Sequence, residues 1–246
     1  MRYLIFSDIH GNLEAFLALL NFIKRRKIDY FLFLGDLVGY GASPNEIIQK
    51  IRALKPISMI RGNHDKAVSG LDSVQTFNPI AATAILWTKK RILKRNQNFL
   101  YKLNKGPLIV HNHITICHGA PFDEDHYIFG EFDAAEAFLH FKTQICFFGH
   151  THFPFVYKEK DHLVEGTFLT GNSSEIKLEK DARYLINPGS VGQPRDRNSR
   201  AAFAIYDSKA RKIKFFRIEY DIKEAQRKIL TANLPPPLAE RLFLGI

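Results

Sequence analysis

The chain has 246 residues, enough for one α/β domain with a large core and small for two. Its composition is that of a globular protein, with 46% hydrophobic and 24% charged residues, and no apolar run reaches the roughly 18 residues that a membrane span requires. Cys117 and Cys146 form no paired motif, so we expect two reduced, buried thiols, with a disulfide as the less favoured alternative. Because the N-terminus lacks the shape of a signal peptide, we expect a cytoplasmic protein without membrane association.

The formal net charge of +10 would attract polyanions such as nucleotides or nucleic acid. The lysines are spread along the chain, and the basic run at residues 24–27 is typical of a solvated helix end. We therefore expect most of the positive charge to serve solubility. Nucleic acid is a possible partner but not the favoured one.

The first third of the chain repeats a buried strand, a polar turn and an amphipathic helix. Strands are predicted at residues 2–7, 30–34 and 56–60, with a helix at residues 13–27. A second helix is predicted to begin at Ser43, because Ser43, Pro44 and Glu46 match a capping box with proline in the first turn.

The remainder of the chain contains more strands than helices. The predicted elements are a mostly helical segment at 66–105, a hairpin of 108–110 and 114–117, a helix opening at Asp133, strands at 145–148, 153–158, 184–187, 201–206 and 213–218, and a C-terminal helix within 221–246. Strands that alternate with helices and then form a meander predict two sheets covered by helices, in a single domain of residues 1–246.

Metal-ligating residue types follow one core strand after another. They are Asp8 and His10, Asp36, Asn63 with His64 and Asp65, His118, and His150 with His152. Each residue alone would be read as a turn or a hydrogen-bonded structural group. Their recurrence at successive strand ends, the edge where α/β sheets bind ligands, predicts a shared site instead.

The residue types indicate a centre with two metal ions. Asp8 and His10 are two residues apart on what we expect to be an extended segment, so their side chains share a face, as do those of His150 and His152. Imidazoles with carboxylates suit Mn, Fe, Zn, Co or Ni, and the absence of thiolates argues against structural zinc. Two ions about 3.5–4 Å apart need a bridging ligand, for which Asp36 is the candidate, and a water between them becomes the nucleophile.

These motifs resemble the calcineurin-like metallophosphoesterase family, whose elements Asp-x-His, Gly-Asp, Gly-Asn-His-Asp, His and Gly-His-x-His all occur in order over residues 8–152. The segments 7–12, 35–41 and 187–195 are similar to those of compact prokaryotic members related to diadenosine-polyphosphate hydrolases and small phosphodiesterases. The resemblance implies a four-layer α/β/β/α sandwich of two mixed sheets flanked by helices.

The resemblance also implies the two sets of ligands. The first metal would be held by Asp8, His10, Asp36 and His152, and the second by Asp36, Asn63, His118 and His150. Both ions are expected to be divalent, with Mn favoured.

Four further residues receive roles from the same resemblance. His64 would stabilise the transferred phosphoryl group or protonate the leaving group. Asp65 would orient His64, with capping of the next helix as the alternative. Arg195 would clamp a phosphate or else lie on the surface. Asn12 would contact substrate or cap the first helix, and capping is favoured.

The predicted function is hydrolysis of a phosphodiester, phosphomonoester or phosphoanhydride by a metal-bridging hydroxide, with a nucleotide or dinucleoside polyphosphate as substrate. A nuclease or a protein phosphatase of the same fold is the alternative. A non-catalytic protein-binding scaffold is the alternative of another class, and the presence of all seven ligands and His64 argues against it. The substrate, the metal and any homo-oligomer stay open.

Overall fold

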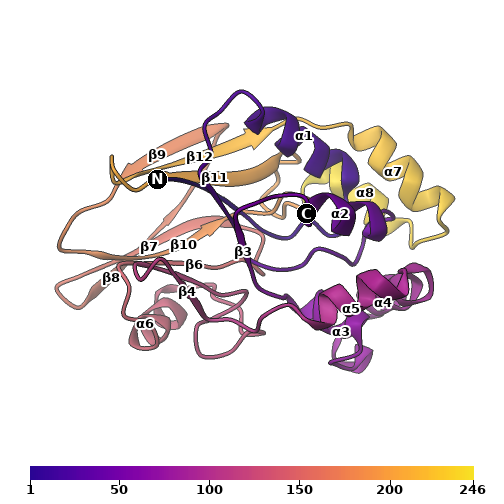
Figure 1. Cartoon of the computed structure of the whole chain (residues 1–246), viewed down its shortest axis with the longest axis horizontal. Helices are drawn as coiled ribbons and strands as arrows, with labels where there is room; N and C mark the ends of the chain where they lie inside the picture. The colour runs from indigo at the N-terminus through magenta and orange to yellow at the C-terminus, as the bar shows by residue number, and fades with distance from the viewer.

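The computed structural model describes residues 1–246 and contains two mixed sheets of six strands each (Figure 1). The first sheet has the order β3-β2-β1-β11-β12-β9, and the second has the order β4-β5-β6-β10-β7-β8. The strands of the first sheet are β1 (Arg2–Phe6), β2 (Tyr30–Phe33), β3 (Ile57–Met59), β9 (Ser173–Lys177), β11 (Ala201–Asp207) and β12 (Lys212–Ile218). Those of the second are β4 (Leu108–Val110), β5 (Ile114–Ile116), β6 (Ile145–Phe147), β7 (Pro154–Lys160), β8 (Leu163–Phe168) and β10 (Arg183–Pro188).

Parallel pairing places several strand ends at one edge of each sheet. In the first sheet β1 runs parallel to β2, and β2 runs parallel to β3. In the second, β6 runs parallel to both β5 and β10. The loops that leave β1, β2, β3, β5 and β6 therefore meet where the two sheets face each other.

Three hydrophobic clusters define the layers. One lies between the sheets and joins residues such as Ile5 of β1 to Phe147 of β6. A second packs the outer face of the first sheet against α1 (Leu13–Ile23) and α2 (Pro44–Ile51), and a third packs the outer face of the second sheet against α6 (Glu131–Leu139). The predicted four-layer sandwich is confirmed.

The remaining helices lie at the end of the sandwich that carries the strand-end loops (Figure 1). They are α3 (Asn63–Ser69), the 3₁₀ turn η1 (Val74–Thr76), α4 (Pro79–Arg91), α5 (Lys94–Tyr101), α7 (Ile222–Thr231) and α8 (Pro237–Leu244). A fourth cluster packs α7 and α8 against α4 and Tyr40. No helix is long and apolar enough to cross a membrane.

The structure corrects several local predictions. Ser43 precedes α2 but makes no side-chain cap hydrogen bond, so the predicted capping box is wrong. Helix α6 begins at Glu131 rather than Asp133, which is instead the third helical residue and accepts from the backbone N–H of Gly130. Strands β8 and β9 were not predicted, and the C-terminal segment forms two helices instead of one. Cys117 and Cys146 are free and buried, as expected.

Candidate metal centre

The seven predicted ligands converge from both sheets. Loops after strands of the first sheet carry Asp8, His10 and Asp36, and Asn63 is the first residue of α3, which follows β3. Loops after strands of the second sheet carry His118, His150 and His152. Six of the seven are buried, and Asn63 is partly exposed. A site assembled this way spans the junction between the two sheets.

The backbone at these ligands is left-handed rather than extended. Asp8 and His10 have φ of 54° and 50°, Asp36 has φ of 63°, and His150 and His152 have φ of 67° and 65°. The extended segments predicted at the Asp-x-His and His-x-His motifs are therefore wrong, although each pair still points into one site. Residues other than glycine seldom adopt this conformation, although aspartate and histidine do so more often than most, and left-handed residues cluster at functional sites.

The donor atoms form three overlapping groups. They are Asp8 with His10 and His152, His10 with Asp36 and His64, and Asp36 with His118 and His150. One oxygen of Asp36, Oδ2, lies 3.5 Å from Nε2 of His10 and also 3.5 Å from Nε2 of His118. Asp36 therefore lies between a histidine of the first predicted ligand set and a histidine of the second, at the position that a shared ligand would occupy.

Backbone carbonyls fix the tautomers of the four imidazoles. Nδ1 of His10 lies 3.1 Å from the Val38 oxygen, and Nδ1 of His118 lies 2.7 Å from that of Leu34. Nδ1 of His152 meets the Gln193 oxygen at 2.6 Å, and Nε2 of His150 meets that of Asp125 at 3.0 Å. Because a carbonyl only accepts, the contacting nitrogen carries a proton. In the neutral rings of His10, His150 and His152 the other nitrogen is left as a lone-pair donor, as in metal-binding histidines, and His118 would offer its Nε2 in the same way once deprotonated.

The electrostatics of the group also suit cations. Both carboxylate oxygens of Asp8 are buried without a hydrogen-bond donor, which would be costly for a carboxylate with no positive partner. Burial raises the pKa of Asp8 to about 7. Burial lowers the pKa of His10 and His152 well below its usual range, so both imidazoles are neutral. At His118 burial acts in the same direction, but the carboxylate of Asp36 outweighs it and raises the pKa to about 10.

His64 lies beside these donors but has different contacts. Its ring packs edge-on against His10 at 4.8 Å between centroids and against Phe77 at 5.1 Å. Its Nδ1 is buried without a hydrogen-bond partner, and a Cβ on Gly39 would come within 2.3 Å of it. Burial lowers the pKa of His64 to about 4, so the ring is neutral at neutral pH.

Asp65 makes the capping contact at the start of α3 that was the alternative prediction, together with further contacts that were not predicted. Its carboxylate accepts from the backbone N–H groups of Asp36, Leu37 and Val38, and from that of Gly62. It makes no hydrogen bond to the ring of His64. Asp65 therefore fixes the turn that carries Asp36, and the orientation of His64 comes from ring packing.

Arg195 lies in the cavity beside the donor groups. This cavity has a volume of about 380 Å³, and its lining includes Asp36, His64, His150 and Arg195. The guanidinium makes only two long contacts, at 3.4 Å to the Tyr40 hydroxyl and 3.3 Å to the Gln193 side chain. Its Nε is buried without a partner. Arg195 therefore offers unused donors to an anion in the cavity.

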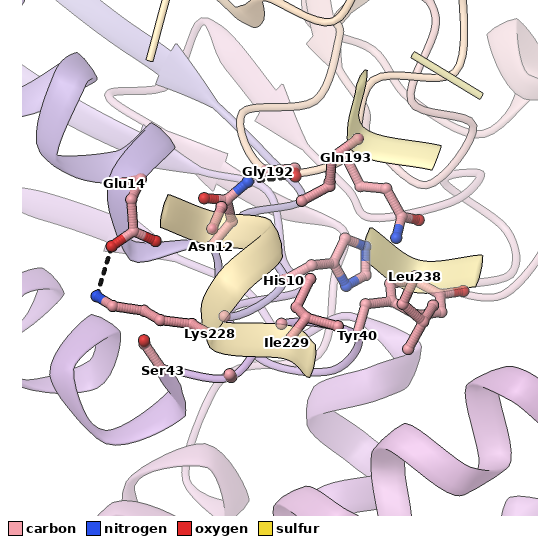
Figure 2. Close-up of a pocket in the computed structure, with 15 residues that line it drawn as sticks. His10, Asn12, Glu14, Tyr40, Ser43, Gly192, Gln193, Lys228, Ile229 and Leu238 are labelled. Atoms are coloured by element: carbon pink, nitrogen blue, oxygen red, sulfur yellow. Dashed lines mark hydrogen bonds and ion pairs between the residues drawn. The ribbon is translucent and has the colours of Figure 1, made fainter. Parts of the chain in front are cut away.

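Asn12 does not line this cavity but a separate small pocket, together with His10 (Figure 2). Its side-chain oxygen accepts from the Ala15 N–H at the start of α1, and its amide donates to the Gly192 carbonyl. Next to it, Lys228 of α7 pairs with Glu14 (Figure 2). Capping is confirmed, and the contacts tie α1 to the loop of residues 189–195.

The loop of residues 119–130 forms one wall of the cavity, although the sequence predicts no role for any single residue in it. The ring of Tyr127 stacks on His150 at 3.8 Å between centroids. Glu124 accepts two hydrogen bonds from Arg61 and one from Lys66, and Lys66 also pairs with Asp125. The only sequence signal was a run of acidic and aromatic residues without a motif.

A family model, calcineurin-like phosphoesterase, matches residues 1–154. The chain is 45% identical to an uncharacterized protein of Methanocaldococcus jannaschii, over 98% of this chain and 97% of that one. The crystal structure of a metallophosphoesterase from Sphaerobacter thermophilus superposes with a TM-score of 0.89 at 37% identity, covering 100% of this chain and 99% of that one. A hypothetical protein from Pyrococcus horikoshii shares the fold, with a TM-score of 0.79, 19% identity and coverage of 100% and 98%. The chain belongs to the calcineurin-like phosphoesterase family.

Proposed function

We propose that the chain is a phosphoesterase with two divalent metal ions that hydrolyses a small phosphorylated molecule. One set of donors, Asp8, His10, Asp36 and His152, would hold the first ion, and Asp36, Asn63, His118 and His150 would hold the second. The observation that carries this proposal is the position of Asp36 Oδ2, equally far from a histidine of each set. When bound, the ions supply Lewis acidity and a water of lowered pKa at neutral pH, with Mn²⁺ the favoured ion.

The residues around the donors would bind and orient the phosphate. Arg195 lines the cavity and keeps guanidinium N–H groups that make no hydrogen bond within the chain, so it could bind phosphate oxygens in a forked geometry. Neutral His64 lines the same cavity and would donate a hydrogen bond to the phosphoryl group or to the oxygen of the leaving group. Both groups would favour the more highly charged transition state over the bound ester.

The walls of the cavity favour a small substrate over nucleic acid. Its volume of about 380 Å³ lies in the range of small-molecule sites. The rim carries the carboxylates of Asp72 and Asp125, and Lys66 is already paired with both. A row of free cations that could follow a nucleic-acid backbone is not found on this rim, so a nucleotide-like molecule is the substrate we propose.

The test is a hydrolysis screen of the chain loaded with Mn²⁺ and, as a control, of the same preparation after chelation. The substrates are bis-p-nitrophenyl phosphate, p-nitrophenyl phosphate, mononucleotides, diadenosine tetraphosphate, a phosphopeptide and single-stranded DNA. We expect Mn²⁺-dependent turnover of one or more small molecules. Turnover that is absent with every divalent ion tried would sink the proposal, and turnover of the phosphopeptide or the DNA alone would replace the small substrate with that class.

A further inference from the structure

A second cavity, lined almost entirely by aromatic side chains, adjoins the cavity beside the metal donors, which we call the catalytic cavity. It has a volume of about 280 Å³. Its lining rings are those of Phe129, Phe153, Phe155, Tyr157 and Phe168. Ile128 and Thr151 complete the lining, so no charged side chain faces this space. We refer to it as the aromatic pocket.

The aromatic pocket and the catalytic cavity share two segments of chain. Thr151, which lines the aromatic pocket, lies between His150 and His152, which line the catalytic cavity. Tyr127 lines the catalytic cavity and Phe129 lines the aromatic pocket, and their rings are parallel within 4° at 5.3 Å between centroids. The wall between the two spaces is therefore one stack of rings.

The aromatic rings of the pocket pack against one another in stacked and tilted arrangements. Phe155 stacks on Tyr157 at 4.5 Å between centroids, and Phe168 lies 6.1 Å from Phe153 and 6.0 Å from Phe155. Phe129 and Phe168 remain 64% and 40% exposed, so the pocket is open to solvent at these two rings. An aromatic ligand bound beside the polar catalytic cavity would cover the exposed faces of these two phenylalanine rings and remove them from water.

We propose that the aromatic pocket binds a planar aromatic ring carried by the substrate, so that this enzyme prefers phosphate esters of nucleosides or aryl alcohols. This inference rests on the proposed function for the position of the phosphate. With the phosphate between Arg195 and the metal donors, the organic part of the ester would extend over the edge of the Tyr127–Phe129 stack toward the aromatic pocket. The aromatic pocket then offers ring faces and no charge, which suits a base or aryl ring and not a second phosphate.

The test compares ligands that differ only in the ring. Dissociation constants of the Mn²⁺-loaded protein are measured by calorimetric titration for AMP against ribose 5-phosphate, and for phenyl phosphate against methyl phosphate. For any ligand that is turned over, kcat/KM from phosphate release replaces the dissociation constant. Because stacking one base on an aromatic side chain changes affinity by about tenfold or more, we expect at least that preference for AMP. A matching preference for phenyl phosphate would identify a general aryl site, and its absence a site for nucleobases.

Two variants, in different segments of the chain, test whether the preference for AMP over ribose 5-phosphate arises in the aromatic pocket. Phe168→Ala on β8 and Phe129→Ala before α6 each remove a partly exposed ring, so neither requires a core rearrangement. We expect each to bring the ratio of AMP to ribose 5-phosphate affinity close to one. Phe132→Ala is the matched control, because Phe132 is 94% exposed on α6 and does not line the pocket. It should keep the full ratio.

The outcomes separate this inference from the proposed function. Equal constants for AMP and ribose 5-phosphate, with hydrolysis intact, would overturn the aromatic pocket and leave the phosphoesterase standing. A ring preference that Phe168→Ala abolishes, in a protein that hydrolyses no ester, would keep the pocket and overturn the function. A dimer in light scattering that Phe168→Ala converts to a monomer, without any ring preference, would show that a second copy covers these rings.

Discussion

The metal-donor turns and the loop of residues 119–130 border the same cavity, but different forces hold them in place. The donor turns are buried, their backbone is left-handed at five ligands, and four imidazoles are each fixed by a main-chain carbonyl. The loop is more exposed and is tied to α3 and to the turn before it by the ion pairs of Lys66 and Arg61 with Glu124. The candidate metal centre is thus specified by the backbone, whereas the cavity wall formed by the loop depends on side chains that can change without altering the fold.

The strongest test of this contrast removes the shared carboxylate. Asp36→Asn keeps an Oδ1 that can accept from the backbone N–H of His64, at 3.0 Å in the structure, but loses the negative charge between the two donor sets. We expect loss of at least one metal by elemental analysis and turnover close to that of buffer with free metal. Asp181→Asn, which changes a surface partner of Lys160, is the control. Normal activity and full metal content in Asp36→Asn would refute the bridging role.

Replacement of His64 should have the next largest effect and should separate catalysis from metal binding. His64→Ala removes a neutral hydrogen-bond donor without removing a member of either proposed ligand set. We expect kcat to fall by about 10²–10³-fold, the usual cost of losing one group that stabilises the transition state. Metal content should stay the same. If the variant loses metal in elemental analysis, His64 is a ligand rather than a catalyst.

The loop of residues 119–130, which forms the cavity wall, is anchored by Lys66. The side chain of Lys66 is 9% exposed and pairs with three carboxylates, two of which lie in this loop. Lys66→Met leaves the carboxylate of Glu124, also 9% exposed, with only Arg61 as its cationic partner. We expect the free energy of unfolding in urea to fall by about 2 kcal/mol and KM to rise while metal content is kept.

The matched control is Lys160→Met. Lys160 likewise pairs with more than one carboxylate, those of Glu179 and Asp181, but all three side chains are more exposed than Lys66 and Glu124. Its loss of stability should be clearly smaller than that of Lys66→Met, because exposed ion pairs contribute little to stability. Equal losses for the two variants would show that Lys66 has no special role at the wall.

The smallest predicted effect distinguishes two helix starts that look alike in sequence. Asn12→Ala removes an observed cap and the bond to Gly192, and should cost about 1 kcal/mol of unfolding free energy. Ser43→Ala removes a side chain that makes no cap bond and should change stability by less than about 0.5 kcal/mol. Urea denaturation measures both, and a larger loss for Ser43→Ala would contradict the assignment of the caps.

The layers and the metal donors were predictable because they depend on local patterns. Buried strands ending in Asp or His can be read directly, and strand-end loops of a parallel sheet meet at one edge whatever the details of packing. The left-handed backbone at Asp8 and His10 could not be read from residue type, since it follows from packing against the loops at 36–41 and 190–193.

The functions of Asp65 and of residues 119–130 depend on long-range contacts. Asp65 accepts from backbone groups almost thirty residues earlier in the chain, and nothing near Asp65 in sequence indicates this. Strands β8 and β9 were missed because their burial alternates along exposed edges, with few apolar residues to form a pattern. Tyr127 and Phe129 carry no motif, so only their stacking beside His150 indicates a role.

The origin of the donors in two different sheets has a consequence for folding equilibrium. An ion held by Asp8 and His10 of one sheet and His152 of the other would bind the native state and not the unfolded chain, so metal concentration and stability are linked. At a free concentration 100 times the dissociation constant, such an ion would add about 2.7 kcal/mol to the free energy of unfolding. Chelation should therefore lower the melting temperature as well as the activity, and amide hydrogens between the sheets should exchange faster in the chelated protein.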